Sequence, residues 1–151
     1  MAGAMVTFDL DPGLYANALA ALARLGGSSL DRISYDVGEF LEVSARARIS
    51  DTKTAPDGTP WAPWSEAYDE TRNHSQHSLL VNRNDLFDSI QNYTSGDTIR
   101  VGTNLVYGAI HQFGSAGAEG GIPARPYLGL SREDEREITD LVIGRLEDLL
   151  Q

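Results

Sequence analysis

The chain has 151 residues, of which 41% are hydrophobic and 23% charged, a size and mix that fit one globular domain with a modest core. It has no cysteine, which excludes disulfides, zinc–thiolate sites and thiol nucleophiles. Its net charge is -10 and its only lysine is Lys53, so a tight nucleic-acid binder is not expected.

The N-terminus carries no signal for export or membrane insertion. Residues 1–5 lack a basic stretch followed by a long apolar one, and no apolar run approaches the ~20 residues that cross a bilayer. We therefore expect no membrane contact and synthesis in the cytoplasm. Met1 and Met5 are both candidates for the native start of the chain.

Two helices are predicted near the N-terminus, after a possible edge strand over the alternating residues 6–10. Asp11-Pro12 supplies an N-cap and a first-turn proline, apolar residues recur at helical spacing, and Gly26-Gly27 ends the run. A second helix begins near Ser29 and continues toward Arg48. Its apolar face holds Ile33, Val37, Phe40 and Leu41.

The segment from about residue 51 to 78 is predicted to be irregular. Pro56, Gly58, Pro60 and Pro63 exclude long regular structure there. Two tryptophans, Trp61 and Trp64, lie among them, which indicates a loop that is anchored by its aromatic residues or that docks on a neighbour.

Short elements follow. Residues 82–85 predict a turn, and residues 93–101 a hairpin that turns at 95–97 with Ile99 and Val101 on one side. Residues 107–113 fit a helical turn or a third strand. The small residues of about 114–121 predict a flexible loop, and the two prolines of residues 122–128 favour an extended segment.

The last helix is predicted to begin after the N-cap Ser131. The acidic run from Glu133 to Glu137 places negative charge in its first turn, and we interpret the run as a solvated face that matches the helix dipole. One apolar stripe follows: Ile138, Leu141, Val142, Leu146 and Leu149. The whole predicts a single α+β domain over residues 1–151, with two N-terminal helices, a small, mostly antiparallel sheet and a C-terminal helix.

No catalytic or metal site stands out. His74 and His77 are three residues apart, but they lie in a polar irregular stretch with no evident third ligand. His111 has no nucleophile motif near it, and we interpret His111 and Gln112 as residues that hydrogen-bond backbone groups in a tight turn. We therefore expect no enzyme, and no metal, cofactor or small-molecule substrate.

Four motifs in the same order resemble the phage virion-morphogenesis family, the Mu-like tail-completion proteins. Residues 55–63 (APDGTPWAP) resemble its PDGxxWxPL segment, and residues 80–89 (LVNRNDLFDS) its LxxTGxLxxS signature. Residues 101–102 and 107–114 (VG, YGAIHQFG) resemble VG…YAxIHQFG, and residues 122–129 (IPARPYLG) resemble IPARPFLG. Trp64 stands where the family has leucine, and Asn84 where it has glycine. Asparagine tolerates the left-handed conformation, so the turn can survive.

The resemblance implies a structural subunit of the virion neck or tail. It would form a homo-oligomeric, six-fold ring that caps the tail tube and helps to join head to tail, with tail-tube and head–tail connector proteins as partners. DNA would pass through this ring without specific binding, helped by the acidic charge. A head-side stopper or adaptor in the same neck is the alternative. A metal-dependent hydrolase using His74, His77 and His111 is a more distant one.

The resemblance also implies assembly contacts. In that setting Pro123 and Pro126 would extend an arm, Arg125 would make a forked contact to a carboxylate or to carbonyl groups, and Tyr127 would anchor an interface. Replacing Arg125 should then weaken assembly and leave the monomer's melting temperature unchanged. Tyr107, His111 and Phe113 would hold their turn against the helices. The full set of interface candidates is Trp61, Trp64, Tyr107, His111, Gln112, Phe113, Pro123, Arg125, Pro126 and Tyr127.

Overall fold

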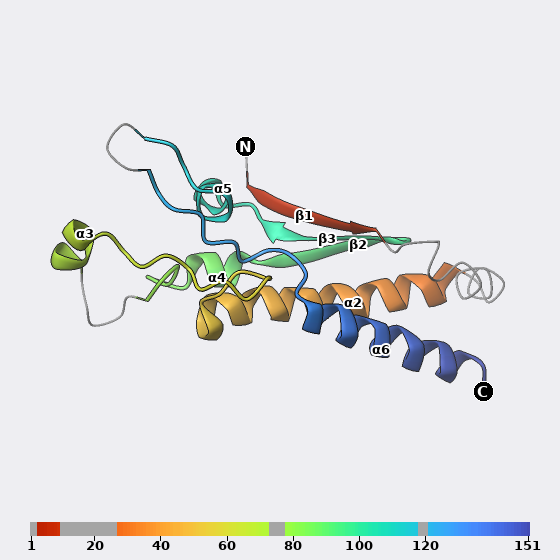
Figure 1. Cartoon of the computed structure of the whole chain (residues 1–151). Coiled ribbons are helices and arrows are strands. Elements are labelled where there is room, and N and C mark those ends of the chain that lie inside the picture. Colours follow the sequence, from red (N-terminus) through yellow and green to blue (C-terminus); the bar gives the residue numbers. More distant parts are fainter. Residues whose placement is uncertain (1–2, 10–26, 73–77, 118–120) are drawn as a thin grey trace.

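The structure is a computed structural model that describes residues 3–9, 27–72, 78–117 and 121–151. The first predicted helix, over residues 11–27, lies almost entirely outside these ranges, and so do His74 and His77. Among the described residues, long helices accompany one small antiparallel sheet, which confirms the predicted α+β class (Figure 1).

The sheet has three strands in the order β1-β3-β2: β1 (Ala4–Asp9), β3 (Thr98–Thr103) and β2 (Gln91–Ser95). The N-terminal edge strand predicted over residues 6–10 is confirmed for residues 6–9 and begins earlier, at Ala4. Among the described residues β1 pairs only with β3, from Ala4 opposite Thr103 to Asp9 opposite Thr98. Strands β2 and β3 form the predicted hairpin, and Gly96 turns it with φ 60°. Ile99 and Val101 are both buried, as their alternation predicts.

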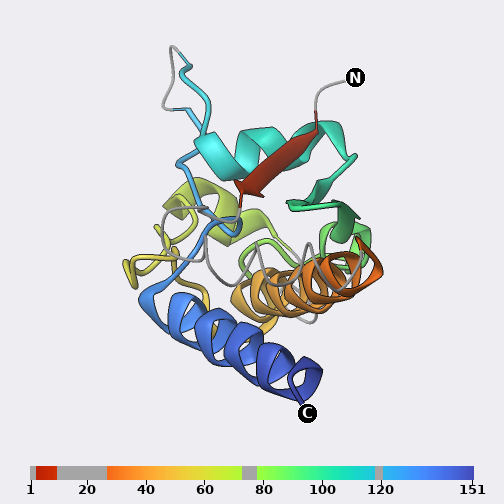
Figure 2. The same cartoon turned by 90° about the vertical axis from the view of Figure 1, so that its right-hand side faces the viewer.

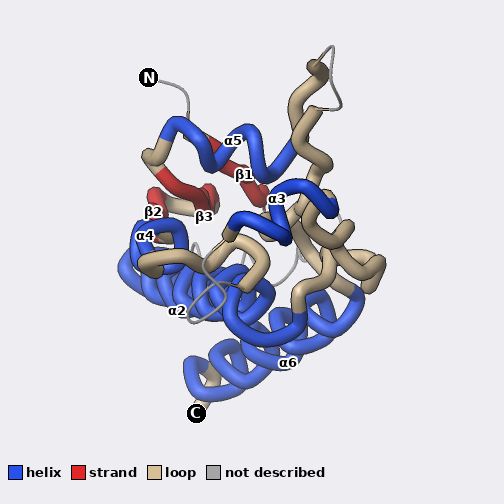
Figure 3. The backbone as a smooth tube through the Cα atoms, turned by 90° about the vertical axis from the view of Figure 1, so that its left-hand side faces the viewer, coloured by secondary structure: helices blue, strands red, loops and turns tan. Residues whose placement is uncertain are grey.

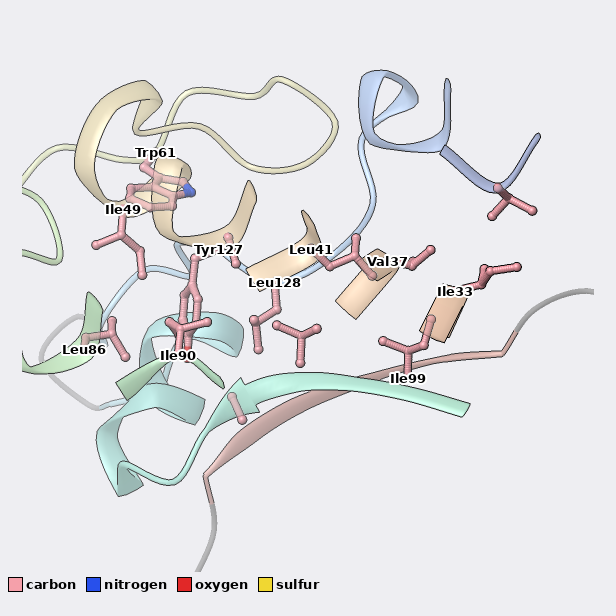
Figure 4. Packing of buried hydrophobic residues seen from close by; sticks show 14 residues of the cluster. Ile33, Val37, Leu41, Ile49, Trp61, Leu86, Ile90, Ile99, Tyr127 and Leu128 are labelled. Atoms are coloured by element: carbon pink, nitrogen blue, oxygen red, sulfur yellow. The ribbon is translucent and has the colours of Figure 1, made fainter. Parts of the chain in front are cut away.

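Helix α2 (Gly27–Ala47) lies between the sheet and helix α6 (Arg132–Leu149) (Figures 1 and 2). Every fourth residue of its inner face is buried, because that spacing returns to the same side of a helix: Ile33, Val37, Leu41 and Ala45, continued by Ile49. Ile49 lies in a π-helical turn, η1 (Arg48–Thr52), that ends α2. These residues meet Ile90, Ile99 and Tyr127 in the core (Figure 4).

Three short helices lie at the end of the molecule away from the C-terminus. Helix α3 (Glu66–Thr71) falls inside the segment predicted to be irregular and begins at Ser65, whose hydroxyl accepts a hydrogen bond from the Tyr68 N–H. It projects at the left of Figure 1 and faces the viewer in Figure 3. Helix α4 (Asp85–Ser89) follows Asn84, which has the left-handed φ of 66° that its place in the motif predicts. Helix α5 (Val106–Phe113) resolves the choice between helix and strand.

The N-terminus of α6 corrects one prediction. Ser131 is its N-cap and forms a reciprocal capping box with Asp134, as expected for this sequence. Asp134, however, is buried, so the acidic run Glu133–Glu137 is not a uniformly solvated face. No helix in the described part of the chain is both long and apolar enough to cross a membrane.

Candidate assembly junction

Three of the sequence motifs meet at one place in the fold. They are α5, an extended segment over residues 122–129 that we call the arm, and residues 55–64, which we call the tryptophan loop. The arm is extended rather than helical, as its prolines predict, and it passes between α5 and the tryptophan loop. Side chains and backbone groups cross-link the three segments, so the motifs describe one structural unit.

Gln112 joins α5 to the arm. Its side-chain N–H donates to the Leu128 carbonyl at 3.0 Å, and its carbonyl oxygen accepts from the N–H groups of Tyr127 at 3.1 Å and Leu128 at 3.0 Å. Proline at two positions of the arm removes N–H groups that a strand ladder would need. The buried amide of Gln112 supplies a donor and an acceptor instead, which confirms its predicted bonding to the backbone.

Tyr127 anchors the arm to α5. Its side chain is 0% exposed, and its hydroxyl donates to the Gly108 carbonyl at 2.9 Å. Burial, together with the neighbouring Tyr107, raises the pKa of Tyr127, so the phenol stays a donor. Gly108 leaves room for it, since a Cβ there would lie 2.9 Å from the hydroxyl and 2.4 Å from Cγ2 of Thr103.

We expect Tyr127→Phe to lower the free energy of unfolding by about 1–2 kcal/mol, because it removes a buried hydrogen bond to the Gly108 carbonyl. Urea denaturation of the isolated chain measures this. Tyr93→Phe is the matched control, because Tyr93 is exposed on β2 and should not change stability. Equal stability of all three proteins would mean that water replaces the lost donor.

Arg125 and Trp61 join the arm to the tryptophan loop. The Arg125 side chain is 5% exposed, and its guanidinium donates to the carbonyls of Ala62 at 2.8 Å and Pro63 at 2.9 Å. The Arg125 N–H donates to the His111 carbonyl at 2.7 Å, and the Trp61 indole N–H donates to the Pro126 carbonyl at 2.9 Å. The predicted fork of Arg125 therefore forms, on carbonyl groups of its own chain.

His111 departs from its predicted role. Its ring meets Tyr107 edge-on, with 5.9 Å between the ring centroids, but its buried Nδ1 has no hydrogen-bond partner among the described residues. Burial, helped by the charge of Arg125, lowers the pKa of His111, so the imidazole is neutral at pH 7. Only the His111 backbone, through its carbonyl, takes part in the junction.

The remaining candidates differ in exposure. Trp61, Gln112, Arg125 and Tyr127 are buried within the chain, Trp64, His111 and Pro126 are half-buried, and Tyr107, Phe113 and Pro123 are exposed. Phe113 is 72% exposed, so the expectation that it holds its turn against the helices is wrong. Contact of any of these residues with a neighbouring subunit stays a prediction.

A hollow of about 330 Å³ opens beside the junction. We call it the aromatic hollow; its walls include Trp64 and Tyr68 from α3 and its approach, Leu80 and Val81 from the turn before α4, and Tyr107 and His111 from α5. The rest of the lining is largely polar and includes Arg83, Asp85 and Arg125. The Trp64 and Tyr68 rings lie 6.1 Å apart, and the Arg72 guanidinium stacks over Trp64 at 3.8 Å. These contacts hold the Trp64 side of the hollow in place.

A second network, which the sequence did not reveal, fixes α6 to the junction. Arg48 donates to the carbonyls of Tyr127 at 3.2 Å and Gly129 at 3.1 Å, and forms a buried ion pair with Asp134. Asp134 also accepts from the hydroxyl of Ser44 at 2.5 Å and from the N–H of Ser131 at 2.8 Å. The S-x-x-D spacing of residues 131–134 predicts the helix cap. Nothing in the sequence near Asp134 indicates that it pairs with Arg48.

No candidate metal centre is present in the ranges that the structure describes. There, no three His, Asp or Glu side chains come close enough together to hold a metal ion. The hydrolase alternative depended on His74 and His77, whose positions are not described, and it stays untested. The buried polar side chains of the junction, such as Gln112 and Arg125, hydrogen-bond backbone groups. They hold segments of the chain in place, so the junction is suited to positioning a surface.

Comparison with known proteins identifies the chain's relatives. It is 32% identical over 139 residues to the putative capsid assembly protein G of Escherichia phage Mu, covering 87% of this chain and 89% of that protein. It is 41% identical over 68 residues to the Mu-like prophage FluMu G protein 2 of Haemophilus influenzae, covering 43% of this chain and 49% of that protein. No solved structure matches significantly. The phage virion morphogenesis family matches residues 14–147, and the chain belongs to this family.

Proposed function

We propose that the chain is a tail-completion subunit that assembles into a ring on the tail tube and helps to join the tail to the head. Membership of the phage virion morphogenesis family over residues 14–147 carries this proposal, because it gives the chain a role in building the virion. The choice of the tail and of a ring goes further than the family description, and rests on the resemblance of the four motifs to tail-completion proteins.

The architecture of the junction supports a structural role. Arm, α5 and tryptophan loop are braced by buried hydrogen bonds, which makes a rigid base for the exposed residues of α5. Those exposed residues are apolar and include Val106 and Phe113, a kind of surface that marks contact with other proteins. A net charge of -10 suits a passage in which DNA must slide without binding.

A head-side connector is the second candidate, since the related protein of phage Mu is named a putative capsid assembly protein. Both positions, at the end of the tail and on the head side, need a small protein that binds copies of itself and its stacked neighbours. They differ in the first partner: a tail-completion subunit binds finished tails before heads are present, whereas a head-side connector binds filled heads.

The experiment uses the phage that encodes the chain, with the gene disrupted. We expect lysates that contain filled heads and separate tails but few joined particles, and rescue when the gene is supplied in trans. Purified protein is then incubated with each fraction, and joining is counted by electron microscopy. Co-sedimentation with tails supports the tail-completion assignment, while binding to heads alone supports the connector. Normal particles without the gene would refute both.

A further inference from the structure

The outer face of α5 is an apolar ridge with no partner in the described chain. Val106, Ile110 and Phe113 follow helical spacing on one side of the helix, and their exposed fractions are 60%, 37% and 72%. Ile122 is also exposed and lies beside the end of α5, because its carbonyl accepts a hydrogen bond from the Ser115 N–H just after the helix. We call these four residues the α5 ridge.

The charge distribution indicates what covers the ridge. The chain carries 22 acidic and 12 basic residues, yet residues 101–118 contain no Asp, Glu, Lys or Arg. Two copies with a net charge of -10 repel each other, so they can approach most easily through a surface without charge. Interface cores are also depleted of charged residues. The ridge therefore suits a second copy of this chain better than a basic partner, which acidic surface elsewhere would attract.

The aromatic hollow has room for one side chain of such a ridge. Its volume of about 330 Å³ is at the small end of the range for binding pockets, enough for one large side chain. Tyr107 and His111 of its wall lie on α5 about 100° around the helix axis from Val106 and Ile110. Ridge and hollow thus face different directions on one rigid helix, and another copy is needed to bring them together.

We propose that the α5 ridge of one copy packs against the next copy, with the Phe113 side chain inserted into that copy's aromatic hollow. The contact is heterologous, because each copy offers a ridge to one neighbour and a hollow to the other, and such contacts repeat into a closed ring or an open filament. This inference rests on the proposed ring-forming function and names the surfaces that build it. Phe113 supplies the buried aromatic anchor, while Trp64 and Tyr68 form the wall that receives it.

Two charged substitutions test the contact, one on each of its two surfaces. Phe113→Glu alters the ridge and Tyr68→Glu alters the hollow; both side chains are exposed, so both variants should fold normally. Tyr93→Glu, exposed on β2 away from both surfaces, is the matched control. Sedimentation velocity over a concentration series should show each variant associating about ten-fold or more weakly than wild type, with the control unchanged.

Mixing the two variants gives the sharpest outcome. Each retains one intact surface, so an equal mixture should form a dimer containing one copy of each and stop there. If two ridges instead met around a two-fold axis, Tyr68→Glu would associate like wild type and the mixture would form no mixed dimer. That result, or wild type that stays monomeric at the highest concentration reached, overturns the proposal.

Cysteine cross-linking identifies the contact directly, because the chain has no cysteine of its own. Phe113→Cys and Tyr68→Cys, made as separate proteins with different tags, are mixed under mild oxidation. Random pairing in an equal mixture gives about twice as much mixed dimer as either self-dimer, so we expect the mixed disulfide dimer to exceed that ratio clearly. The random ratio, or a dominant Phe113→Cys self-dimer, counts against the proposal. If cross-linking fails but the disrupted phage still accumulates unjoined heads and tails, this inference is lost and the proposed function stands.

Discussion

Arg125→Ala should lower the free energy of unfolding of the isolated chain by about 2–4 kcal/mol. The guanidinium is buried and donates to the carbonyls of Ala62 and Pro63. Hydrogen bonds from a charged donor contribute about 1.5–3 kcal/mol each, and two bonds of one group do not add fully. Alanine also leaves both carbonyls without a donor, so the tryptophan loop should separate from the arm.

Urea unfolding followed by tryptophan fluorescence measures this loss, since Trp61 lies in the same junction and donates to Pro126. Arg125→Lys should recover part of the stability, because one ammonium cannot reproduce the fork to two carbonyls. Arg83→Ala is the matched control, an exposed arginine whose removal should have little effect. An Arg125→Ala protein as stable as wild type would show that the fork contributes nothing to the fold.

The expected result for Arg125 is the opposite of the one that the motif alone implies. From the motif alone, Arg125 resembles an assembly residue whose loss leaves the melting temperature unchanged. In the structure, its side chain braces one segment of the same chain, through two adjacent carbonyls that lie 62 and 63 residues away. A motif identifies residues that matter together, but it does not reveal whether their partner is the same chain or another.

Features that depend on neighbouring residues could be predicted. The buried face of α2 follows from apolar spacing, the β2–β3 hairpin from its turn residues, and the start of α6 from the Ser131 cap. The left-handed Asn84 is of the same kind, because the demand for a positive φ is local. Each of these is decided within a few residues, where backbone geometry and side-chain type suffice.

Features that depend on tertiary approach could not be predicted. The Arg48–Asp134 pair joins residues 86 apart, and the sequence around Asp134 fits an exposed acidic turn equally well. The exposure of Phe113 has the same origin. Apolar residues on several sides of α5 give no single inner face, so only the position of β1 and the arm decides which side is covered.

We expect Asp134→Ala to have the largest effect on stability, about 3–5 kcal/mol, because it leaves the buried Arg48 without its counter-charge. It also removes the capping box of α6 and the acceptor of Ser44. Chemical denaturation measures the loss, and Glu135→Ala is the control, an exposed acid in the same helical turn that should cost less than about 1 kcal/mol. Equal effects of the two substitutions would place the contribution in the helix dipole instead of the ion pair.

The pH dependence of the free energy of unfolding separates the contribution of the charge of Asp134 from that of its size. Burial raises the pKa of this carboxyl, but hydrogen bonds from Ser44 and Ser131 and the charge of Arg48 outweigh burial and hold the pKa below its usual range. A depressed pKa stabilises the fold fully above the unfolded value of about 3.9, and the contribution is lost as pH falls through the folded value. The difference in stability between wild type and Asp134→Asn should therefore be constant from about pH 5 to 8 and shrink below about pH 4. Asparagine keeps the size of the side chain but not its charge, so a difference that stays constant down to pH 3 would mean that the ion pair with Arg48 does not fasten α6 to the junction.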